Sequence, residues 1–451
     1  MKLQSINPFS GELIESFETF TEAEVEVCIE KSIHAQKLWK NTTIGLRAEI
    51  LRKISTGLRI KTDQYAASIT REMGKPMKES LVEIKKCAWL CNYYADEGPG
   101  FLTTESIHTD ASQSFVRYEP LGVILAIMPW NYPFWQVFRC AIPAMLAGNS
   151  VLLKHASSVQ RCALLIEEIM KAAGIPEGLF QTLVISSSDI EKVIVHPAIR
   201  SISLTGSEFA GSRVAETAGK NLKKTVLELG GSNAFIVLED ADLEAAATIG
   251  VQSRMQNAGQ SCIAAKRFIL HNKIADSFMH LFIEKMLKLR MGDPSDRATD
   301  MGPLVSLKQA EILEDQLERS IKSGARLISG GSRKNCFFSP TVLDRVTPGM
   351  AAFDEETFGP LTPMINVNHE DEAINLANKT QYGLGVSIFT RNIEKALSLT
   401  LEFDDGAVFI NSLVKSDPRL PFGGTKHSGY GRELARAGIM EFVNAKTVFV
   451  Q

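Results

Sequence analysis

The sequence predicts an α/β protein in which a doubly wound parallel sheet is joined to a second α/β unit and a small β arm. Three observations support this prediction. The chain of 451 residues is too long for one ordinary hydrophobic core, so two or more domains are expected. The first part of the chain carries apolar residues at helical spacing. Later, short apolar runs alternate with helical stretches in two successive series, which is the pattern of parallel βαβ units.

The N-terminal part is expected to be mainly helical between residues 21 and 100. Apolar residues recur at helical spacing in three stretches, Glu22–Trp39, Ile44–Ile60 and Lys78–Asp96. No internal repeat or low-complexity segment is present in the sequence. We therefore expect helices that pack against the sheets that follow rather than a repeat architecture.

The first alternating series begins after residue 120. Its short apolar runs have the length of strands and are Gly122–Met128, Ser150–Lys154, Gln181–Ile185, Ser201–Thr205 and Thr225–Leu229. Helical stretches, Val159–Ala173 and Ser207–Lys220, lie between them. A doubly wound sheet binds its ligands beyond the carboxyl ends of its strands, so the residues that follow these runs are candidates for a binding site.

The second series follows Glu228. It is expected to contain a strand, a helix, a strand and a helix, at Asn233–Leu238, Leu243–Gln256, Lys266–Leu270 and Ala275–Lys288. Glu228 therefore lies at the boundary between two α/β units, where small-molecule sites concentrate. Two more segments, Ser112–Tyr118 and Glu441–Val450, are predicted to be extended, either as separate arms or as edge strands of the main sheets.

The composition excludes several classes of protein. A hydrophobic content of 45% with 22% charged residues is typical of a soluble globular protein, and a net charge of −3 argues against nucleic acid or an anionic membrane as the main partner. No apolar run reaches the length of a bilayer span and no signal region is present, so a cytoplasmic location is expected. The 7 cysteines include no CxxC pair, which predicts free thiols in a reducing compartment. The 8 histidines include no HExxH motif, so no catalytic metal is expected.

Glu228 and Cys262 are the candidates for a base and a nucleophile. Glu228 is followed closely by two adjacent glycines, which leave space around the carboxylate, and Gly259 allows a close backbone approach shortly before Cys262. A cysteine attacks as the thiolate and needs a proton acceptor nearby. Taken singly, each residue has an ordinary alternative: a cysteine is most often a small buried side chain, and a glutamate is usually a solvated surface charge.

Several further motifs are found in a fixed order along nearly the whole chain. They are PWNYP at Pro129–Pro133, LTGS at Leu204–Ser207, ELGG at Glu228–Gly231, the segment that ends at Cys262, EETFGP at Glu355–Pro360 and PFGG at Pro421–Gly424. Any one of them is a weak signal, but their combination resembles the aldehyde dehydrogenase superfamily. Glu228 and Cys262 both fall within this set.

The resemblance implies a Rossmann-like cofactor domain, a second α/β catalytic domain and a small β oligomerisation arm. The expected dinucleotide-binding domain comprises residues 1–100 and 120–229, the catalytic domain residues 230–428, and the arm residues 101–119 and 429–451. A homodimer or homotetramer is expected. The hydrophobic strand Thr447–Val450 gives this a physical reason, because such an edge invites pairing.

A nucleotide cofactor is expected although the GxGxxG fingerprint and the Walker P-loop are both absent. A strand that ends at Thr205 runs into Gly206 and Ser207 and then a helix, whose N-terminus offers N–H groups to a pyrophosphate. By itself this pattern is equally typical of an ordinary strand-helix turn. The resemblance places the dinucleotide here, and it assigns cofactor contacts to Trp130, Lys154, Ser157, Thr205, Gly206, Ser207, Gly211, Leu229, Glu356 and Phe358.

The choice between NADP and NAD depends on Ser157. In the family, Lys154 would bind the adenosine ribose, and NAD-selective members commonly carry a glutamate at the position of Ser157. A neutral hydroxyl beside a lysine can accept a 2′-phosphate, so NADP is expected to be tolerated, and a preference for it over NAD is left open. Glu356 resembles the family residue that holds the nicotinamide ribose. Phe358 resembles the aromatic residue that limits the position of the nicotinamide. A solvated acidic turn is the alternative for Glu356.

The resemblance also implies a reaction. Cys262 would attack an aldehyde carbonyl, and Asn131 would stabilise the oxyanion together with the backbone N–H of Cys262. Hydride transfer would then leave a thioester, which a water activated by Glu228 would hydrolyse. Relatives that transfer the acyl group to coenzyme A lack this glutamate, so Glu228 favours release of a free acid.

The most similar group within the family is that of the succinate-semialdehyde dehydrogenases. Arg139, on the helix expected after Asn131, would bind the distal carboxylate of the semialdehyde, since arginine does this by bidentate contact. The alternative is an arginine on the surface or one paired to a local acid. Trp135, Ser261 and Ser416 are the other expected substrate contacts.

Two positions depart from that group. Gln256 stands where some members carry a second carboxylate-binding arginine, and whether the nearby Arg254 replaces it is left open. Ala264 stands where some members carry a second cysteine, so no disulfide with Cys262 is expected.

The predicted function is NAD(P)-dependent oxidation of an aldehyde to a carboxylic acid, with succinic semialdehyde as the expected substrate. One alternative is a dehydrogenase of broad specificity for neutral aliphatic or aromatic aldehydes, in which Arg139 is structural. Another is a dinucleotide-binding structural protein without activity, which the combination of Asn131, Glu228 and Cys262 argues against. A coenzyme A acylating enzyme is argued against by Glu228.

Overall fold

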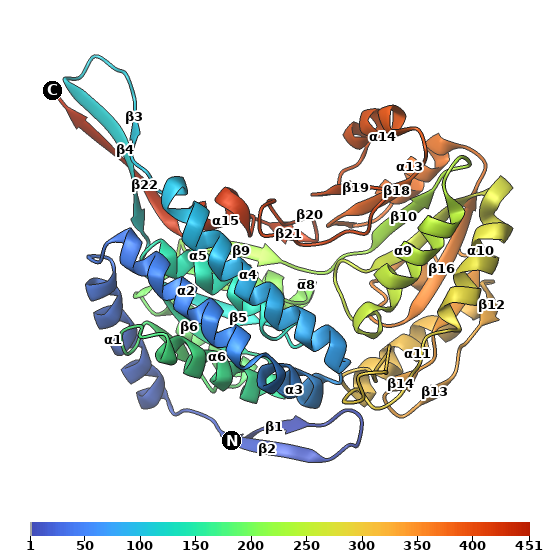
Figure 1. Ribbon diagram of the computed structural model, residues 1–451, viewed down its shortest axis with the longest axis horizontal. Helices are drawn as coiled ribbons and strands as arrows, with labels where there is room; N and C mark the ends of the chain where they lie inside the picture. Colours follow the sequence, from blue (N-terminus) through green and yellow to red (C-terminus); the bar gives the residue numbers. More distant parts are fainter. Residues whose placement is uncertain (1) are drawn as a thin grey trace.

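The computed structural model describes residues 2–451. Two lobes lie side by side, and a β arm projects from the first of them (Figure 1). The first lobe is built on a six-stranded sheet and the second on a seven-stranded sheet. The α/β class predicted from the sequence is therefore confirmed.

The six-stranded sheet has the strand order β21-β9-β8-β5-β6-β7. Its strands are β5 (Val123–Met128), β6 (Ser150–His155), β7 (Phe180–Thr182), β8 (Ile199–Thr205), β9 (Lys224–Glu228) and β21 (Gly429–Tyr430). The strands β5 to β9 are parallel, and β21 is antiparallel to β9. The chain proceeds from β5 to β6 and β7 on one side and returns to place β8 on the other side of β5. The order therefore reverses between β5 and β8, which is where a doubly wound sheet binds its ligands.

The expected strand at Gln181–Ile185 is shorter and begins earlier than predicted. Strand β7 covers Phe180–Thr182, and the backbone N–H of Ile185 bonds the carbonyl of Leu183. Leu183 still donates to the carbonyl of Leu153 in β6, and the chain turns away from the sheet edge after it, although the apolar pattern continues. The other predicted strands of this sheet are found within a few residues of their expected bounds.

Helices cover the six-stranded sheet. They are α1 (Glu22–Trp39), α2 (Ile44–Ile60), α3 (Thr62–Met73), α4 (Met77–Phe101), α5 (Trp135–Leu146), α6 (Gln160–Ala172), α7 (Ile190–Val195) and α8 (Glu208–Lys220). Helix α1 begins at a capping box, in which Thr21 and Glu24 exchange hydrogen bonds, and this explains why its predicted start was right. A hairpin of β1 (Lys2–Ile6) and β2 (Leu13–Glu18) lies beneath this lobe (Figure 1).

The seven-stranded sheet has the order β12-β15-β16-β11-β10-β18-β19. Its strands are β10 (Asn233–Val237), β11 (Ala265–His271), β12 (Arg326–Ser329), β15 (Thr341–Asp344), β16 (Leu361–Val367), β18 (Val386–Phe389) and β19 (Val408–Ile410). Its helices are α9 (Leu243–Met255), α10 (Asn272–Met286), α11 (Leu307–Lys322), α12 (Ala351–Asp354), α13 (Glu370–Asn378) and α14 (Ile393–Leu399). The rings of Phe235, Phe268 and Phe278 pack against one another at tilted angles in the core between the sheet and α10.

The remaining elements are short. Two small antiparallel pairings join β13 (Arg333–Lys334) to β14 (Phe337–Phe338) and β17 (Tyr382–Gly383) to β20 (Thr425–Lys426). Single 3₁₀ turns are found at Ser157–Val159, Ser187–Asp189, Gln256–Gly259 and Thr400–Glu402. Helix α15 (Ala435–Met440) leads from the first lobe into the last strand.

The arm is a sheet of β3 (Glu105–Ser106), β4 (Gln113–Pro120) and β22 (Val443–Val450). Strand β22 is antiparallel to β4 along its whole length, from Val443 opposite Pro120 to Val450 opposite Gln113. The two extended segments of the sequence therefore pair with each other and are not edge strands of the main sheets. The proposed domain boundaries stay a prediction; within the range 429–451, β21 pairs with β9 of the first lobe.

Candidate active site

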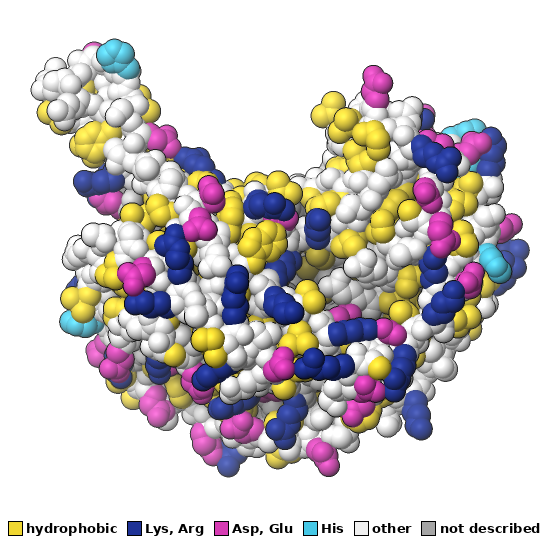
Figure 2. Space-filling view, in the orientation of Figure 1, with side chains coloured by type: hydrophobic (Ala, Val, Ile, Leu, Met, Phe, Trp, Pro, Cys, Tyr) yellow, Lys and Arg dark blue, Asp and Glu magenta, His cyan; other side chains and the backbone are white. Residues whose placement is uncertain are grey.

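Two cavities lie between the lobes and meet at Cys262. The larger has a volume of about 680 Å³ and the smaller about 270 Å³, and both are lined by Cys262 and Gln136. The space-filling view shows the surface hollowed between the two lobes (Figure 2). A nucleophile at the junction of two cavities can face one ligand in each, which is the arrangement needed for a reaction between two bound molecules.

Cys262 follows a strained loop. Asn257 and Ala258 have φ of 53° and 52°, and Gly259 has φ of 75°. At Gly259 a side chain is impossible, because a Cβ would lie 2.3 Å from the carbonyl oxygen of Gly359. The loop is held by hydrogen bonds from the Asn257 backbone N–H to Glu79 and from its side-chain amide to the carbonyl of Asn131. The glycine recognised in the sequence therefore shapes the loop that carries the nucleophile.

The thiol of Cys262 is protonated at neutral pH in this state of the protein. Burial of the sulfur raises its pKa to about 11, while the charges of Arg139 and Lys266 act in the opposite direction. Attack by this thiol therefore requires that a base accept its proton.

Glu228 ends β9 and is 2% exposed. Neither of its carboxylate oxygens has a hydrogen-bond partner among residues 2–451. Burial raises its pKa well above the ordinary value, and the nearby carboxylate of Glu433 raises it further, whereas Arg139 and Arg432 lower it. Glu228 does not belong to the lining of either cavity. It lies against Gly423, because a Cβ added to Gly423 would be 2.7 Å from Oε1 of Glu228. The carboxylate is basic, and it sits behind the cavity walls.

Asn131 lines the smaller cavity and is 4% exposed. Gln136 donates to its Oδ1 at 3.0 Å, which fixes the orientation of the amide, and its Nδ2 donates to the carbonyl of Gln260 at 3.1 Å. One N–H of the amide therefore remains to donate to a ligand. This is the arrangement expected of an oxyanion donor.

Arg139 is buried and paired with an acid. It extends from α5 into the lining of the larger cavity, and its Nε lies 2.8 Å from Oε2 of Glu433, with side chains 3% and 1% exposed. Its Nη2 donates to Gln136 and Thr205, and its guanidinium lies 4.7 Å from the ring centre of Phe422. The structure thus shows the alternative considered for Arg139, an arginine paired to a local acid, which counts against the prediction that it binds a substrate carboxylate.

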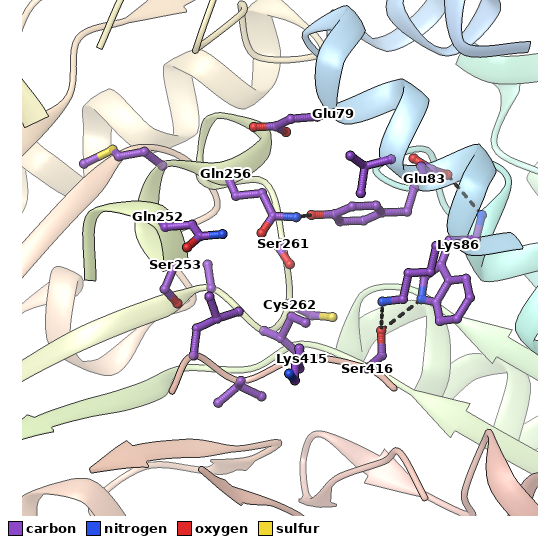
Figure 3. A pocket seen from close by; sticks show the side chains of 18 of the residues that line it. Glu79, Glu83, Lys86, Gln252, Ser253, Gln256, Ser261, Cys262, Lys415 and Ser416 are labelled. Atoms are coloured by element: carbon purple, nitrogen blue, oxygen red, sulfur yellow. Dashed lines mark hydrogen bonds between the residues drawn. The ribbon is translucent and has the colours of Figure 1, made fainter. Parts of the chain in front are cut away.

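The other expected substrate contacts line the larger cavity (Figure 3). Trp135 and Ser416 are hydrogen-bonded, from Nε1 to Oγ at 3.0 Å, and Ser261 lies beside the nucleophile. Gln256 donates to the hydroxyl of Tyr132 at 3.2 Å.

The question about Arg254 is answered by its hydrogen bonds. Arg254 is 0% exposed and is absent from the lining of both cavities. Its guanidinium donates to the backbone carbonyls of Ala265, Thr357 and Gly359. It therefore joins β11 to the segment before β16 and does not replace the missing arginine.

The smaller cavity lies at the point where the order of the six-stranded sheet reverses. Trp130 follows β5, and Thr205, Gly206 and Ser207 follow β8; all four line this cavity. The rings of Trp130 and Phe358 lie 5.6 Å apart, edge to face. A flat ring can be held between such side chains.

Two predicted cofactor residues, Ser207 and Gly211, have structural roles at this cavity. Ser207 caps α8, because its hydroxyl accepts from the N–H of Ala210. Gly211 packs under Leu229, where a Cβ would lie 2.5 Å from Cδ2 of that leucine. Gly211 thus supports the wall that Leu229 lines.

Glu356 has a partner that the sequence did not suggest. Its Oε1 lies 2.5 Å from Nζ of Lys266, a lysine 1% exposed on β11, and accepts from the N–H of Gly231 at 3.0 Å. The interpretation of Glu356 as a solvated acidic turn is therefore wrong: it is half-buried and lines the smaller cavity.

Lys154 and Ser157 lie further along the same sheet edge, at and after the end of β6, outside the lining of the smaller cavity. Lys154 is 7% exposed, and its Nζ donates to Ser187 at 3.1 Å. It makes no ion pair with any described residue, and burial lowers its pKa. Ser157 is exposed.

Two further findings bear on the exclusions made from the sequence. Within residues 2–451, no group of three or more histidine, cysteine or acidic side chains is placed to hold a metal ion. None of the helices in this part of the chain is long and apolar enough to span a membrane.

The chain belongs to the aldehyde dehydrogenase family, whose sequence profile matches residues 1–448. It is 46% identical over 456 residues to a probable NADP(+) succinate-semialdehyde dehydrogenase of Synechocystis sp., with 100% of both chains covered. It is 43% identical over 448 residues to the NAD(P)+ succinate semialdehyde dehydrogenase Sad of Escherichia coli, covering 99% of this chain and 97% of that one. The crystal structure of succinic semialdehyde dehydrogenase from Streptococcus pyogenes in complex with NADP+ superposes with a TM-score of 0.97 at 38% identity and 99% coverage of both chains.

Proposed function

We propose that this protein oxidises succinic semialdehyde to succinate with NADP or NAD as the hydride acceptor. The observation that carries the proposal is the position of Cys262, where a cavity that can admit an aldehyde and has basic groups in its wall meets a cavity at the reversal point of the doubly wound sheet. The relatives named for this reaction match the chain over its full length, which supports the substrate and the cofactor.

The residues fit a dinucleotide. A buried lysine without an acidic partner, Lys154, suits the ribose or phosphate of the adenosine half, and Ser157 adds a hydroxyl without a negative charge. The N-terminus of α8 at Ser207 suits the pyrophosphate. Glu356 and Phe358 would hold the nicotinamide half near Cys262. When bound, the nicotinamide supplies the acceptor for the hydride of the aldehyde.

The protein groups act on the substrate in sequence. The thiol proton of Cys262 passes to a water molecule of the cavity, and the sulfur attacks the aldehyde carbon. The remaining N–H of Asn131 stabilises the oxyanion that forms. After oxidation the acyl group is held as a thioester on Cys262. Glu228 then removes a proton from water as the water oxygen adds to the thioester carbonyl, and the C–S bond breaks to release the acid and the Cys262 sulfur. The raised pKa of Glu228 suits this role. Because its carboxylate lies behind the cavity wall, the side chain has to rotate toward Cys262 for this step.

A neutral aldehyde is the second candidate substrate, and the lining of the larger cavity favours it in part. Val82, Trp135, Leu413 and Phe422 present an apolar surface that would suit an aliphatic or aromatic chain. Both candidates share the same chemistry at Cys262, so they differ only in what binds the far end of the substrate.

We further propose a homodimer or homotetramer and a cytoplasmic location. Strand β22 is an edge of the arm sheet, and Phe449 and Val450 on it are 50% and 44% exposed, so the arm offers a surface for a second copy. The seven cysteines are all free, which is consistent with a reducing compartment. Light scattering on the intact chain tests the first of these proposals.

The substrate is tested by comparing kcat/KM for succinic semialdehyde and butanal, which has the same carbon chain without the carboxylate, each with NADP and with NAD. We expect a preference for the semialdehyde of about a hundredfold, equivalent to roughly 2.7 kcal/mol. Equal values would reject the semialdehyde in favour of a neutral aldehyde. No NAD(P)H formation with either would reject dehydrogenase activity toward both.

A further inference from the structure

Helix α4 carries a lysine into the larger cavity that no sequence motif pointed to. Glu79, Val82, Glu83 and Lys86 recur at helical spacing and all line this cavity (Figure 3). One face of α4 therefore forms a wall of the substrate channel. Lys86 is half-buried on that wall.

The acids of the same wall are engaged elsewhere. Glu83 lies 2.5 Å from Nζ of Lys75 and accepts from the backbone N–H groups of Phe134 and Trp135 at 2.9 and 3.0 Å. Glu79 accepts from the backbone N–H of Asn257 at 2.8 Å. Neither carboxylate makes an ion pair with Lys86.

Most cations of the cavity lining are also neutralised. Their ion pairs are Lys78 with Asp300, Lys285 with Glu244 and Arg139 with Glu433. Among the described residues, Lys86 and the exposed Lys415 are the two cations of this lining without an acidic partner. A positive charge in a channel without a counter-charge favours an anionic ligand.

Lys86 is held in a defined position. Its Nζ lies 2.8 Å from Oγ of Ser416 and 4.2 Å from the ring centre of Trp135, and the indole Nε1 of Trp135 also bonds Ser416 Oγ, at 3.0 Å (Figure 3). Ammonium and indole nitrogens can only donate, so Ser416 accepts both bonds and its own O–H proton points elsewhere. No acceptor for that proton is found among residues 2–451. The hydroxyl and the ammonium are thus two donors side by side.

The surroundings make this ammonium receptive to a carboxylate. Burial lowers the pKa of Lys86 to about 8, and the charge of Arg139 adds to the effect, while the charges of Asp417 and Glu83 act in the opposite direction without forming an ion pair with Lys86. A carboxylate that bound here would replace lost hydration and stabilise the charged form.

We propose that Lys86, together with the hydroxyl of Ser416, binds the distal carboxylate of the aldehyde substrate, in place of Arg139, which Glu433 occupies. This inference rests on the proposed function, because it needs a substrate that carries an aldehyde at one end and a carboxylate at the other. Lys86 would then set the specificity of the site, while Cys262, Asn131 and Glu228 carry out the reaction.

The test compares kcat/KM for succinic semialdehyde and butanal in the wild type and in Lys86→Met, Lys86→Arg and Lys415→Met. Methionine keeps the length of the lysine stem without its charge, and Lys415→Met is the matched control for the other unpaired cation of the lining. We expect Lys86→Met to lower kcat/KM for the semialdehyde roughly 10- to 100-fold, as for a lost charge-assisted hydrogen bond. Butanal values should change less than about threefold, which also shows that the variant is folded. Lys86→Arg should recover part of the loss, and Lys415→Met should leave the preference intact.

Four results would overturn the inference. An equal fall for both aldehydes in Lys86→Met would make the lysine structural. Unchanged kcat/KM values for both aldehydes in Lys86→Met would leave the proposed function standing and assign the carboxylate to another group. An equal loss of preference in Lys415→Met would show that the positive charge of the cavity attracts the carboxylate in general, without a direct contact to Lys86. If the wild type itself shows no preference, the proposed semialdehyde function fails, and the inference fails with it.

Discussion

The pair of Arg139 and Glu433 gives a quantitative test of what the buried arginine does. In Arg139→Met, Glu433 keeps its buried position at 1% exposure and loses the cation that lies 2.8 Å away. Breaking a buried ion pair by removing one partner costs about 3–5 kcal/mol, and loss of the contact with the ring of Phe422 adds about 1 kcal/mol. We therefore expect the free energy of unfolding to fall by roughly 4–6 kcal/mol near pH 8.

The size of this loss should depend on pH. Burial already raises the pKa values of Glu433 and Glu228, and Arg139 lowers both, so its removal raises them further. A carboxyl whose pKa is raised in the folded state contributes stability at low pH that is lost as the pH rises through that value. The destabilisation should therefore be smaller near pH 5.5 than near pH 8.

Urea unfolding followed by tryptophan fluorescence measures the effect at both pH values. The double variant Arg139→Met/Glu433→Gln should recover about half of the loss or more, because the uncompensated charge is gone. In activity assays the single variant should lower kcat/KM for succinic semialdehyde and butanal by the same factor. An unchanged urea midpoint together with a selective rise in KM for the semialdehyde would refute this reasoning and restore Arg139 as a substrate ligand.

Three further predictions concern the base, the loop and the cofactor. Glu228→Gln should keep a burst of NAD(P)H of one equivalent in stopped-flow absorbance while steady-state turnover falls about 10²- to 10⁴-fold, and loss of the burst would contradict the separate role of Glu228 in hydrolysis. The pKa of Glu79 is raised to about 7, chiefly by burial, and glutamine can still accept from the N–H of Asn257. A buried carboxyl of raised pKa stabilises the folded protein less as the pH rises through that pKa. Glu79→Gln should therefore increase the melting temperature relative to wild type near pH 8.5 and not near pH 5. The same shift at both pH values would argue against titration of Glu79. Ser157→Glu should raise KM for NADP at least about tenfold by charge repulsion and leave KM for NAD within about threefold, whereas equal KM changes for both would place the 2′-phosphate elsewhere.

Local sequence signals predicted the parts of the fold that depend on neighbouring residues. Helices α1 and α2 have the predicted bounds because their apolar spacing agrees with the capping residues Thr21 and Thr43. The pairing of β4 with β22 could not be predicted, since extended segments at distant positions give no information about their partners. Helix α4 was predicted too short, because its apolar pattern weakens before Phe101 while the helix continues through Pro99.

The residues of the candidate site likewise fall into those that the sequence predicted and those that it missed. Asn131, Glu228 and Cys262 were found from motifs, and the structure gathers Asn131 and Cys262 at the smaller cavity, with Glu228 behind its wall. Glu433 and Lys86 were missed, because each acts through a partner far away in the sequence, at Arg139 and at Ser416. Lys86 follows Lys85 directly and lies near Glu83 in α4, so no local signal set it apart from an ordinary solvated lysine.

The most direct test of the central claim is to identify the residue that carries the acyl group. Glu228→Gln would be mixed with succinic semialdehyde and NADP, quenched in acid and analysed by peptide mass spectrometry. The account predicts one succinyl group on the peptide that contains Cys262, in an amount equal to the NADPH formed, and none on the other six of the seven cysteines. Formation of NADPH without an acyl group on Cys262, or with the acyl group on another cysteine, would contradict it.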